Sequence, residues 1–265
     1  MDGQTRPTAN FAASHNAAGG SRLTHRPFAG HESVWYQGSR RWRKHLPRAG
    51  LSMALHLADM IPWGRTFEEY TAMFALDRAD RSRSILGCGD GPASFNAEAL
   101  RHNVKVVSAD PLYEFSVAQI REWIAEAAPT VAAQLSSDAG DSRMCAMQIF
   151  LDDFVEGSDQ GRYVPAELPN LPFFDGTFDL ALCSHLLFIS SHKRDAEFHI
   201  KAVQELCRVA QEVRIFPLVE VNGTPSRHLP QVTEALGAAG CAVTVEPVSY
   251  ELPKGANQMM RIICP

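Results

Sequence analysis

Three glycines alternate with other residues in the stretch "ILGCGDG", at Gly87, Gly89 and Gly91. Because glycine carries no side chain, a turn built from it lets backbone N–H groups approach a bound ligand closely. An apolar run precedes the stretch. A helix-like segment follows it and opens with Pro92, a residue suited to the first helical position because its missing N–H costs little there. This pattern is typical of a ligand-binding turn between a strand and a helix.

An acidic residue at the end of the next apolar segment narrows the choice of ligand. The stretch "VKVVSAD" ends in Asp110, twenty-three residues after Gly87, where a carboxylate can accept hydrogen bonds from both hydroxyl groups of a ribose. The turn and the acid together predict a cofactor that contains a nucleoside. Pro92 stands where the dinucleotide fingerprint requires glycine or alanine, and no Gly-Lys-Ser/Thr follows, so neither that fingerprint nor a phosphate-binding P-loop matches.

Strand-like and helix-like segments alternate around these residues. Strands separated by helix-length segments predict an α/β protein with a Rossmann-like, doubly wound, mainly parallel sheet of seven strands. No helix separates the last two strands, so one of them is expected to run antiparallel at the edge. The strands are expected at residues 82–87, 104–110, 162–166, 178–184, 212–219, 242–248 and 258–264. The helices are expected at residues 92–101, 116–128, 143–155, 195–210 and 229–239. Ligands of such sheets bind beyond the carboxyl ends of the strands, where the glycine turn falls.

The first 50 residues differ in composition from the rest of the chain. They carry a net charge of +6 against −11 for the remainder, and they lack a sustained apolar period. We therefore expect a disordered basic leader, because such a segment cannot bury enough apolar surface to order itself. Its stretch 39–45, "SRRWRKH", suits an anionic surface, and an acid-poor, Arg-rich leader also suits a transit peptide. Met53 is a candidate for an alternative translation start.

Two further regions flank or interrupt the predicted sheet. Residues 51–81 have helical spacing on both sides of Pro62, which predicts an N-terminal cap of helices. Residues 82–265 form the ligand-binding domain, with a partly irregular helical insert at about residues 130–160.

The apolar runs, the cysteines and the acidic residues argue against a membrane protein, a disulfide-rich protein and a metalloprotein. The run "FDLALCSHLLFIS" contains Asp179 and falls short of the roughly 20 residues of a membrane helix, so we expect a soluble, cytoplasmic protein. The six cysteines form no C-x-x-C pair, so we interpret them as reduced thiols and expect no disulfide framework and no zinc site. Asp152, Asp153 and Glu156 are interpreted as a solvated helix face, and no metal site is predicted.

The sequence resembles the class I S-adenosylmethionine-dependent methyltransferases over residues 82–264. Four stretches carry the resemblance, in the order of the family: "ILGCGDG", "VVSAD", "AELPNLPFFDGTFDLALCSHLL" and "AVQELCRVAQEVRIFPLV". The resemblance implies S-adenosylmethionine as the cofactor and methyl transfer to a small-molecule acceptor. The acidic charge of the folded part disfavours a nucleic-acid substrate, although the basic leader leaves RNA as a possibility.

The resemblance also assigns roles to individual residues. The glycine turn would lie along the methionine part of the cofactor, and Asp110 with Pro111 would lie at its ribose. Glu167 and Leu168 would lie at its adenine. Cys183 and Ser184, at the end of the fourth strand, would lie near its methyl group. These cofactor-binding residues are Gly87, Cys88, Gly89, Asp90, Gly91, Asp110, Pro111, Glu167, Leu168, Cys183 and Ser184. The family carries an acid where this chain has Ile85, so Asp90 is a candidate for holding the cofactor's ammonium group.

Two predictions near the site leave an alternative open. His185 follows the fourth strand, where it would accept a proton from the substrate or orient it, or would be structural. In "WGRTFEEY", Arg65 would meet the cofactor carboxylate while Trp63, Phe67 and Tyr70 close over the cofactor. Alternatively, Trp63 and Phe67 belong to the core and Arg65 is exposed.

Two other functions are compatible with this type of fold. An NAD-type oxidoreductase is disfavoured by Pro92 and by the stretch from Glu167 to Asp179. A non-catalytic protein that binds S-adenosylmethionine is favoured by Ile85 and by the lack of an unambiguous catalytic group.

Overall fold

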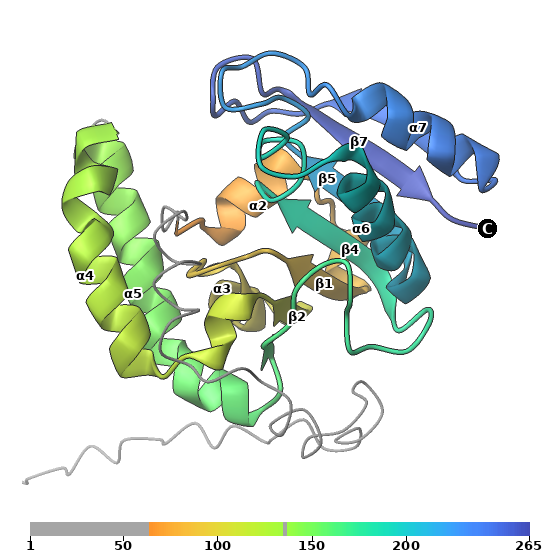
Figure 1. Ribbon diagram of the computed structural model, residues 1–265. Helices are drawn as coiled ribbons and strands as arrows, with labels where there is room; N and C mark the ends of the chain where they lie inside the picture. The colour runs from red at the N-terminus through yellow and green to blue at the C-terminus, as the bar shows by residue number, and fades with distance from the viewer. Residues whose placement is uncertain (1–63, 135–136) are drawn as a thin grey trace, which may run out of the picture. The chain divides into compact units, whose positions relative to one another are not determined.

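A seven-stranded sheet forms the centre of the computed structural model, which describes residues 64–134 and 137–265 (Figure 1). The strand order is β3-β2-β1-β4-β5-β7-β6. All pairs are parallel except those of β7, which runs antiparallel to β5 and to β6. The strands are β1 Ser84–Cys88, β2 Lys105–Ala109, β3 Tyr163–Val164, β4 Phe178–Ser184, β5 Ala210–Phe216, β6 Ala242–Pro247 and β7 Gln258–Ile263. The predicted Rossmann-like, mainly parallel sheet of seven strands is confirmed, and its antiparallel strand β7 lies next to the edge strand β6.

The sheet is apolar on both faces, as expected for parallel strands covered on both sides. Successive side chains of a strand point to opposite faces, and β4 divides its residues accordingly. Leu180 and Leu182 belong to one core cluster, whereas Ala181 and Cys183 belong to another, and all four are fully buried. The nearly continuous apolar sequence of β4 is therefore explained by burial on both faces of the sheet.

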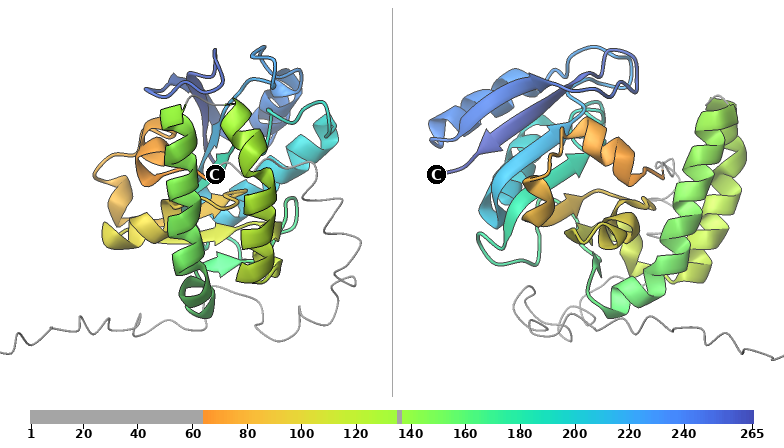
Figure 2. Two further views of the ribbon diagram at one scale, coloured as in Figure 1. Left: turned by 90° about the vertical axis from the view of Figure 1, so that its left-hand side faces the viewer. Right: turned by 180° about the vertical axis from the view of Figure 1, so that it is seen from behind.

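Helices cover the two faces. The face of Leu180 is covered by α2 (Phe67–Met73) and α3 (Phe95–Arg101), whose aromatic residues join its cluster. The face of Cys183 is covered by α6 (Ala196–Val209) and α7 (Leu229–Ala238). Figure 2 shows α2 and α6 on opposite sides of the sheet. Within the described residues, α2 represents the predicted N-terminal cap; the leader, Met53 and Trp63 lie outside them.

The insert before β3 is more regular than expected. It consists of two long helices, α4 (Val117–Gln134) and α5 (Ser137–Asp159), which lie side by side at the β3 edge of the sheet (Figure 2). They share a third apolar cluster, formed by Leu112, Tyr113, Ile120, Trp123, Ile124, Met147, Phe150, Leu151, Phe154 and Tyr163. The insert is helical as predicted, but its described residues are regular where an irregular part was expected, because this mutual packing sustains the helices and α4 continues through Pro129.

The helix after the glycine turn begins later than predicted. Gly91 has a φ of +54° and turns the chain, Pro92 lies in this turn, and α3 starts only at Phe95. Pro92 is therefore not the first residue of the helix. Among the described residues, no helix has the length and apolar character needed to cross a lipid bilayer.

Candidate functional site

The glycine turn lies at the carboxyl end of β1, and its three glycines have different surroundings. Gly89 and Gly91 have φ angles of +75° and +54°, which favour glycine. A β-carbon on Gly89 would lie 2.9 Å from Cδ2 of Leu186, whereas a β-carbon on Gly91 would have no atom within 4 Å. Of the three, Gly91 faces open space.

Gly87 makes room for a side chain of the protein itself. A β-carbon at this position would overlap the carboxylate of Asp90, lying 2.6 Å from its Cγ atom. The expectation that Gly87 clears space for a cofactor is therefore wrong, because its neighbouring space is filled by Asp90.

The carboxyl group of Asp90 is buried beneath the turn. Its Oδ1 accepts a 2.6 Å hydrogen bond from the Tyr70 hydroxyl, and its Oδ2 accepts one of 2.6 Å from the Ser108 hydroxyl. Burial raises the pKa of Asp90 to about 7. Both oxygens are engaged by protein donors, so Asp90 fastens α2 and β2 to the turn. Each of its oxygens keeps a second lone pair, so a role of Asp90 in holding a cofactor's ammonium group stays a prediction.

Asp110 lies beside the turn, at the end of β2. Its Oδ2 accepts a 2.9 Å hydrogen bond from the N–H of Gly91, and its Oδ1 accepts one of 2.8 Å from the N–H of Leu112. It precedes Pro111, the first residue of the short helix η3 (Pro111–Glu114). Burial raises the pKa of Asp110 to about 6. Each carboxylate oxygen has a second lone pair, so Asp110 can still accept a ligand hydroxyl.

A second carboxylate lies near Asp110. The negative charge of Glu167 contributes to the raised pKa of Asp110. Glu167 is exposed and pairs with Arg194 at 3.2 Å. The next residue, Leu168, has its side chain in the core, so only its backbone is available to a ligand. Gly91, Asp110 and Glu167, which are far apart in the sequence, thus come together at the carboxyl edge of the sheet.

The residues at the ends of β1 and β4 are more enclosed than expected. Cys88 and Cys183 are paired in register and buried, and burial raises the pKa of Cys183 to about 12. Ser184 is also buried, with its hydroxyl 3.9 Å from the sulfur of Met73 in α2. Helix α2 therefore covers the end of β4.

His185 has a defined protonation state. Its Nε2 lies 3.2 Å from the carbonyl oxygen of Leu252, which can only accept, so Nε2 carries the hydrogen and Nδ1 accepts from the Ser184 hydroxyl at 3.0 Å. Burial, together with the charges of Arg65 and Arg143, holds the pKa of His185 well below its usual range. The imidazole is neutral, and both its nitrogens are engaged by the protein.

The two buried arginines whose charges lower the pKa of His185 share a hydrogen-bond partner. Arg65 donates to the Tyr250 hydroxyl at 2.6 Å, and that hydroxyl donates to Oε1 of Glu69 at 2.8 Å. Arg143 of α5 forms an ion pair with Glu69 and donates to Tyr250 at 3.1 Å. These four residues, called here the arginine cluster, join α2, α5 and residues 248–257.

The arginine cluster carries an excess of positive charge, because it holds two guanidinium groups and one carboxylate. Among the described residues, the Nε of Arg143 is buried without a hydrogen-bond partner. Arg65 is only 5% exposed, so the prediction of an exposed Arg65 is wrong, whereas Phe67, at 4%, is a core residue as the same alternative predicted. Sequence reasoning missed Glu69, Arg143 and Tyr250. Of these, only Glu69 has a local signal, the capping box that it forms with Thr66.

The acidic residues of α5 interact with other side chains of the same chain. Asp152 and Glu156 accept hydrogen bonds from Gln148 and Gln160, and Asp153 forms an ion pair with Arg162 at 2.7 Å. Asp152 and Glu156 are exposed as predicted, whereas Asp153 is only partly so.

The strand order of the sheet is that of the Rossmann-like fold of class I methyltransferases. The glycine turn at the end of β1, which contacts an acid at the end of β2, agrees with this fold. No family profile matches the sequence. A curated relative, an uncharacterized protein of Methanocaldococcus jannaschii, is 26% identical over 223 residues, which cover 78% of this chain and 98% of that protein.

Solved structures with a similar course of the chain include two methyltransferases. Magnesium protoporphyrin IX methyltransferase of Synechocystis PCC 6803, with bound SAM, is 12% identical with a TM-score of 0.44, and the match covers 85% of this chain and 90% of that one. The N-methyltransferase of Bradyrhizobium japonicum WM9, in complex with S-adenosyl-L-homocysteine, is 13% identical with a TM-score of 0.44, covering 81% and 97%. At these similarities the functions of those proteins do not transfer to this chain.

Proposed function

We propose that the protein binds S-adenosylmethionine at the carboxyl edge of its sheet and transfers the methyl group to a small-molecule acceptor. The observation that carries the proposal is the grouping of Gly91, Asp110 and Glu167. A glycine facing open space lies against one carboxylate that retains free lone pairs, and a second carboxylate lies nearby. A nucleoside needs such acceptors for its ribose hydroxyls and its amino group.

The residues around the turn fit the chemical groups of this cofactor. Asp110 would bind the ribose hydroxyls, and Glu167, with the backbone of Leu168, would bind the adenine. The backbone at Gly89 and Gly91 would lie along the methionine part, and the surplus positive charge at Arg65 suits its carboxylate. When bound, S-adenosylmethionine supplies a methyl group on a positively charged sulfur, which is the electrophile of the transfer.

His185 is proposed to act on the acceptor. Methyl transfer requires the acceptor atom in line with the methyl group, and positioning of this kind supplies roughly 7–11 kcal/mol in favourable cases. A neutral imidazole has one nitrogen that can take a proton, and in His185 this is Nδ1. An acceptor hydroxyl or amine would replace the Ser184 hydroxyl at Nδ1, where it would be oriented and give up its proton.

Two observations favour the alternative of a non-catalytic binding protein. Both nitrogens of His185 are engaged by the protein, and Ile85 is buried in the core at the position where the family carries an acid. This alternative shares the cofactor site and differs only in the absence of methyl transfer.

Calorimetry with the purified full chain tests the cofactor first. S-adenosylmethionine and its demethylated product are expected to bind, and NAD is the negative control. Failure of both sulfur nucleosides to bind would overturn the proposal, and binding of NAD instead would favour an oxidoreductase. If the cofactor binds, labelled S-adenosylmethionine incubated with small-molecule extracts identifies the acceptor. Binding without label transfer to any fraction would support the non-catalytic alternative.

A further inference from the structure

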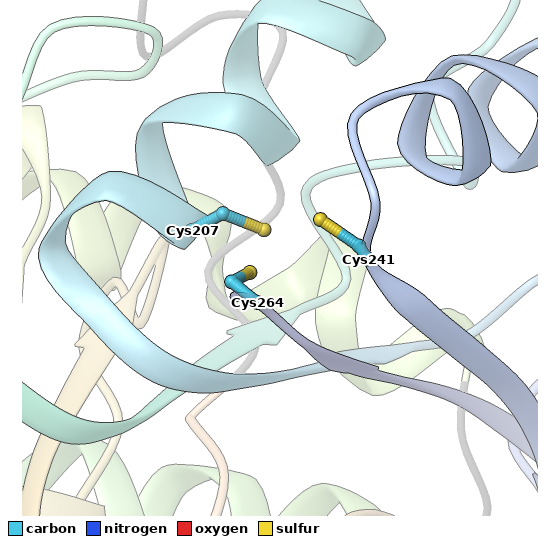
Figure 3. Close-up of side chains that lie close together, drawn as sticks. All are labelled: Cys207, Cys241 and Cys264. Carbon is cyan, nitrogen blue, oxygen red and sulfur yellow. The ribbon is translucent and has the colours of Figure 1, made fainter.

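Three cysteines that are distant in the sequence converge near one end of the sheet. Cys207 lies in the last turn of α6, Cys241 precedes β6, and Cys264 follows β7. Their sulfur atoms all lie within 4.8 Å of one another, and Figure 3 shows the three side chains directed toward a common space. No C-x-x-C pair in the sequence indicates this grouping of free thiols, which we call the thiol cluster.

The spacing of the sulfur atoms suits a metal ion better than a disulfide. Zinc–sulfur bonds of about 2.3 Å in tetrahedral geometry place the sulfur atoms about 3.8 Å apart. Sulfur atoms within 4.8 Å of one another reach that separation by small side-chain rotations. A disulfide requires about 2.05 Å between two sulfurs and would leave the third thiol unpaired.

The surroundings of the thiol cluster match those of a soft-metal site. All three side chains are partly buried and pack against the core cluster that includes Ala181 and Cys183. The sulfurs are thus backed by apolar groups, while partial exposure leaves a path for an ion. Thiolate ligands select zinc and other soft ions over magnesium and calcium, which prefer oxygen.

We propose that Cys207, Cys241 and Cys264 together bind one thiophilic metal ion of the zinc class, with a water molecule or an external ligand in the fourth position. Binding forms three metal–sulfur bonds and releases the three thiol protons to solvent, without any change of oxidation state.

The position of the thiol cluster separates the ion from the glycine turn. Cys207 and Cys264 flank the amino end of β5 and the carboxyl end of the antiparallel strand β7, whereas the glycine turn lies at the carboxyl end of β1, at the opposite end of the parallel strands. A metal ion here would tie α6, the segment before β6 and the end of β7 together. It would therefore stabilise the fold at this edge without taking part in the chemistry of the turn.

Metal titration of the reduced, chelator-treated full chain tests this proposal. We expect one Zn²⁺ per chain, release of protons on binding, and a thiolate charge-transfer band when Co²⁺ replaces Zn²⁺. We also expect the melting temperature to rise by several degrees with Zn²⁺. Cys264→Ser, near the end of the chain, and Cys207→Ser should each weaken Zn²⁺ binding by at least tenfold.

The matched control is Cys145→Ser, an exposed thiol on α5. It should bind Zn²⁺ as the wild type does, and circular dichroism checks that each variant is folded. The proposal is overturned if the wild type binds no more Zn²⁺ than a variant with all three thiols replaced by serine. It is also overturned if mild oxidation converts two of the three thiols to a disulfide while Zn²⁺ fails to protect them.

Discussion

The carboxyl group of Asp90 occupies the space beside the α-carbon of Gly87, so that any larger residue at position 87 would place its β-carbon against it. The Tyr70 and Ser108 hydroxyls hold this carboxyl group in place with hydrogen bonds of 2.6 Å each. The first glycine of the turn is thus required by the protein's own acid, and this acid connects α2, β1 and β2.

Replacing Gly87 with alanine should destabilise the protein. The new methyl group would displace the Asp90 carboxyl group and strain its two hydrogen bonds, at a cost of about 1–3 kcal/mol. Urea unfolding measures the change. Gly237→Ala, in an exposed part of α7 where a β-carbon would have no atom within 4 Å, is the matched control and should stabilise by about 0.5–1 kcal/mol. Equal stability of the Gly87→Ala variant and the wild type would contradict the packing described.

The raised pKa of Asp90 should appear in the pH dependence of stability. A carboxyl group whose pKa is about 7 in the folded protein, against an ordinary value of 3.8, binds more protons in the folded state between these values. Its contribution to stability is complete below pH 4 and is lost as the pH rises to 7, at up to about 1.4 kcal/mol per pH unit.

Asp90→Asn isolates this effect, because the amide does not titrate. The difference in the free energy of unfolding between wild type and variant, measured by urea unfolding at pH 5, 6, 7 and 8, should change in favour of the variant up to about pH 7 and then level off. A difference that is constant across this range would show that Asp90 titrates normally.

Glu69 should be essential for the stability of the arginine cluster. Its replacement by glutamine leaves the guanidinium groups of Arg65 and Arg143 buried without a counter-charge, at a cost of about 3 kcal/mol. Glu68→Gln is the matched control, because Glu68 is the exposed neighbour on the same helix, and its replacement should change stability by less than about 0.5 kcal/mol. Thermal unfolding compares the two variants, and similar melting temperatures would rule out this role.

Glu167 should contribute to cofactor affinity without contributing to folding. Glu167→Ala removes an exposed carboxylate and should weaken S-adenosylmethionine binding about tenfold, or about 1.4 kcal/mol, with little change in melting temperature. Glu197→Ala removes another exposed, ion-paired carboxylate, on α6, and should leave the affinity unchanged. Calorimetry measures both, and equal affinities would remove Glu167 from the site.

His185 should affect turnover more than cofactor binding. Asparagine tolerates the φ of +54° found at this position, so His185→Asn should fold, and it should lower the rate of methyl transfer at least about a hundredfold. Because the pKa of His185 is held well below its usual range, the wild-type rate should show no titration near pH 6.5. Unchanged turnover of His185→Asn, with cofactor binding intact, would exclude the proposed role.

The architecture followed from local patterns in the sequence. Strand and helix periods alternate along the chain, and such alternation permits few arrangements other than a parallel sheet with two covered faces. The strand β4 matched its predicted bounds because burial on both faces makes it almost continuously apolar. The insert was less predictable, since α4 and α5 are sustained by packing against each other.

The fold class, and the meeting of Gly91 with Asp110 in the candidate site, were predictable from local sequence patterns, because adjacent strands of a parallel sheet end at the same edge. The groups that surround these two residues depend on the packing of distant elements. The Asp90 carboxyl group turns inward because Tyr70 and Ser108 reach it, and Glu69 meets Tyr250 across 181 residues of chain. The thiol cluster likewise joins three elements with no shared motif. Such contacts depend on how distant elements pack, and no local period of the sequence encodes them.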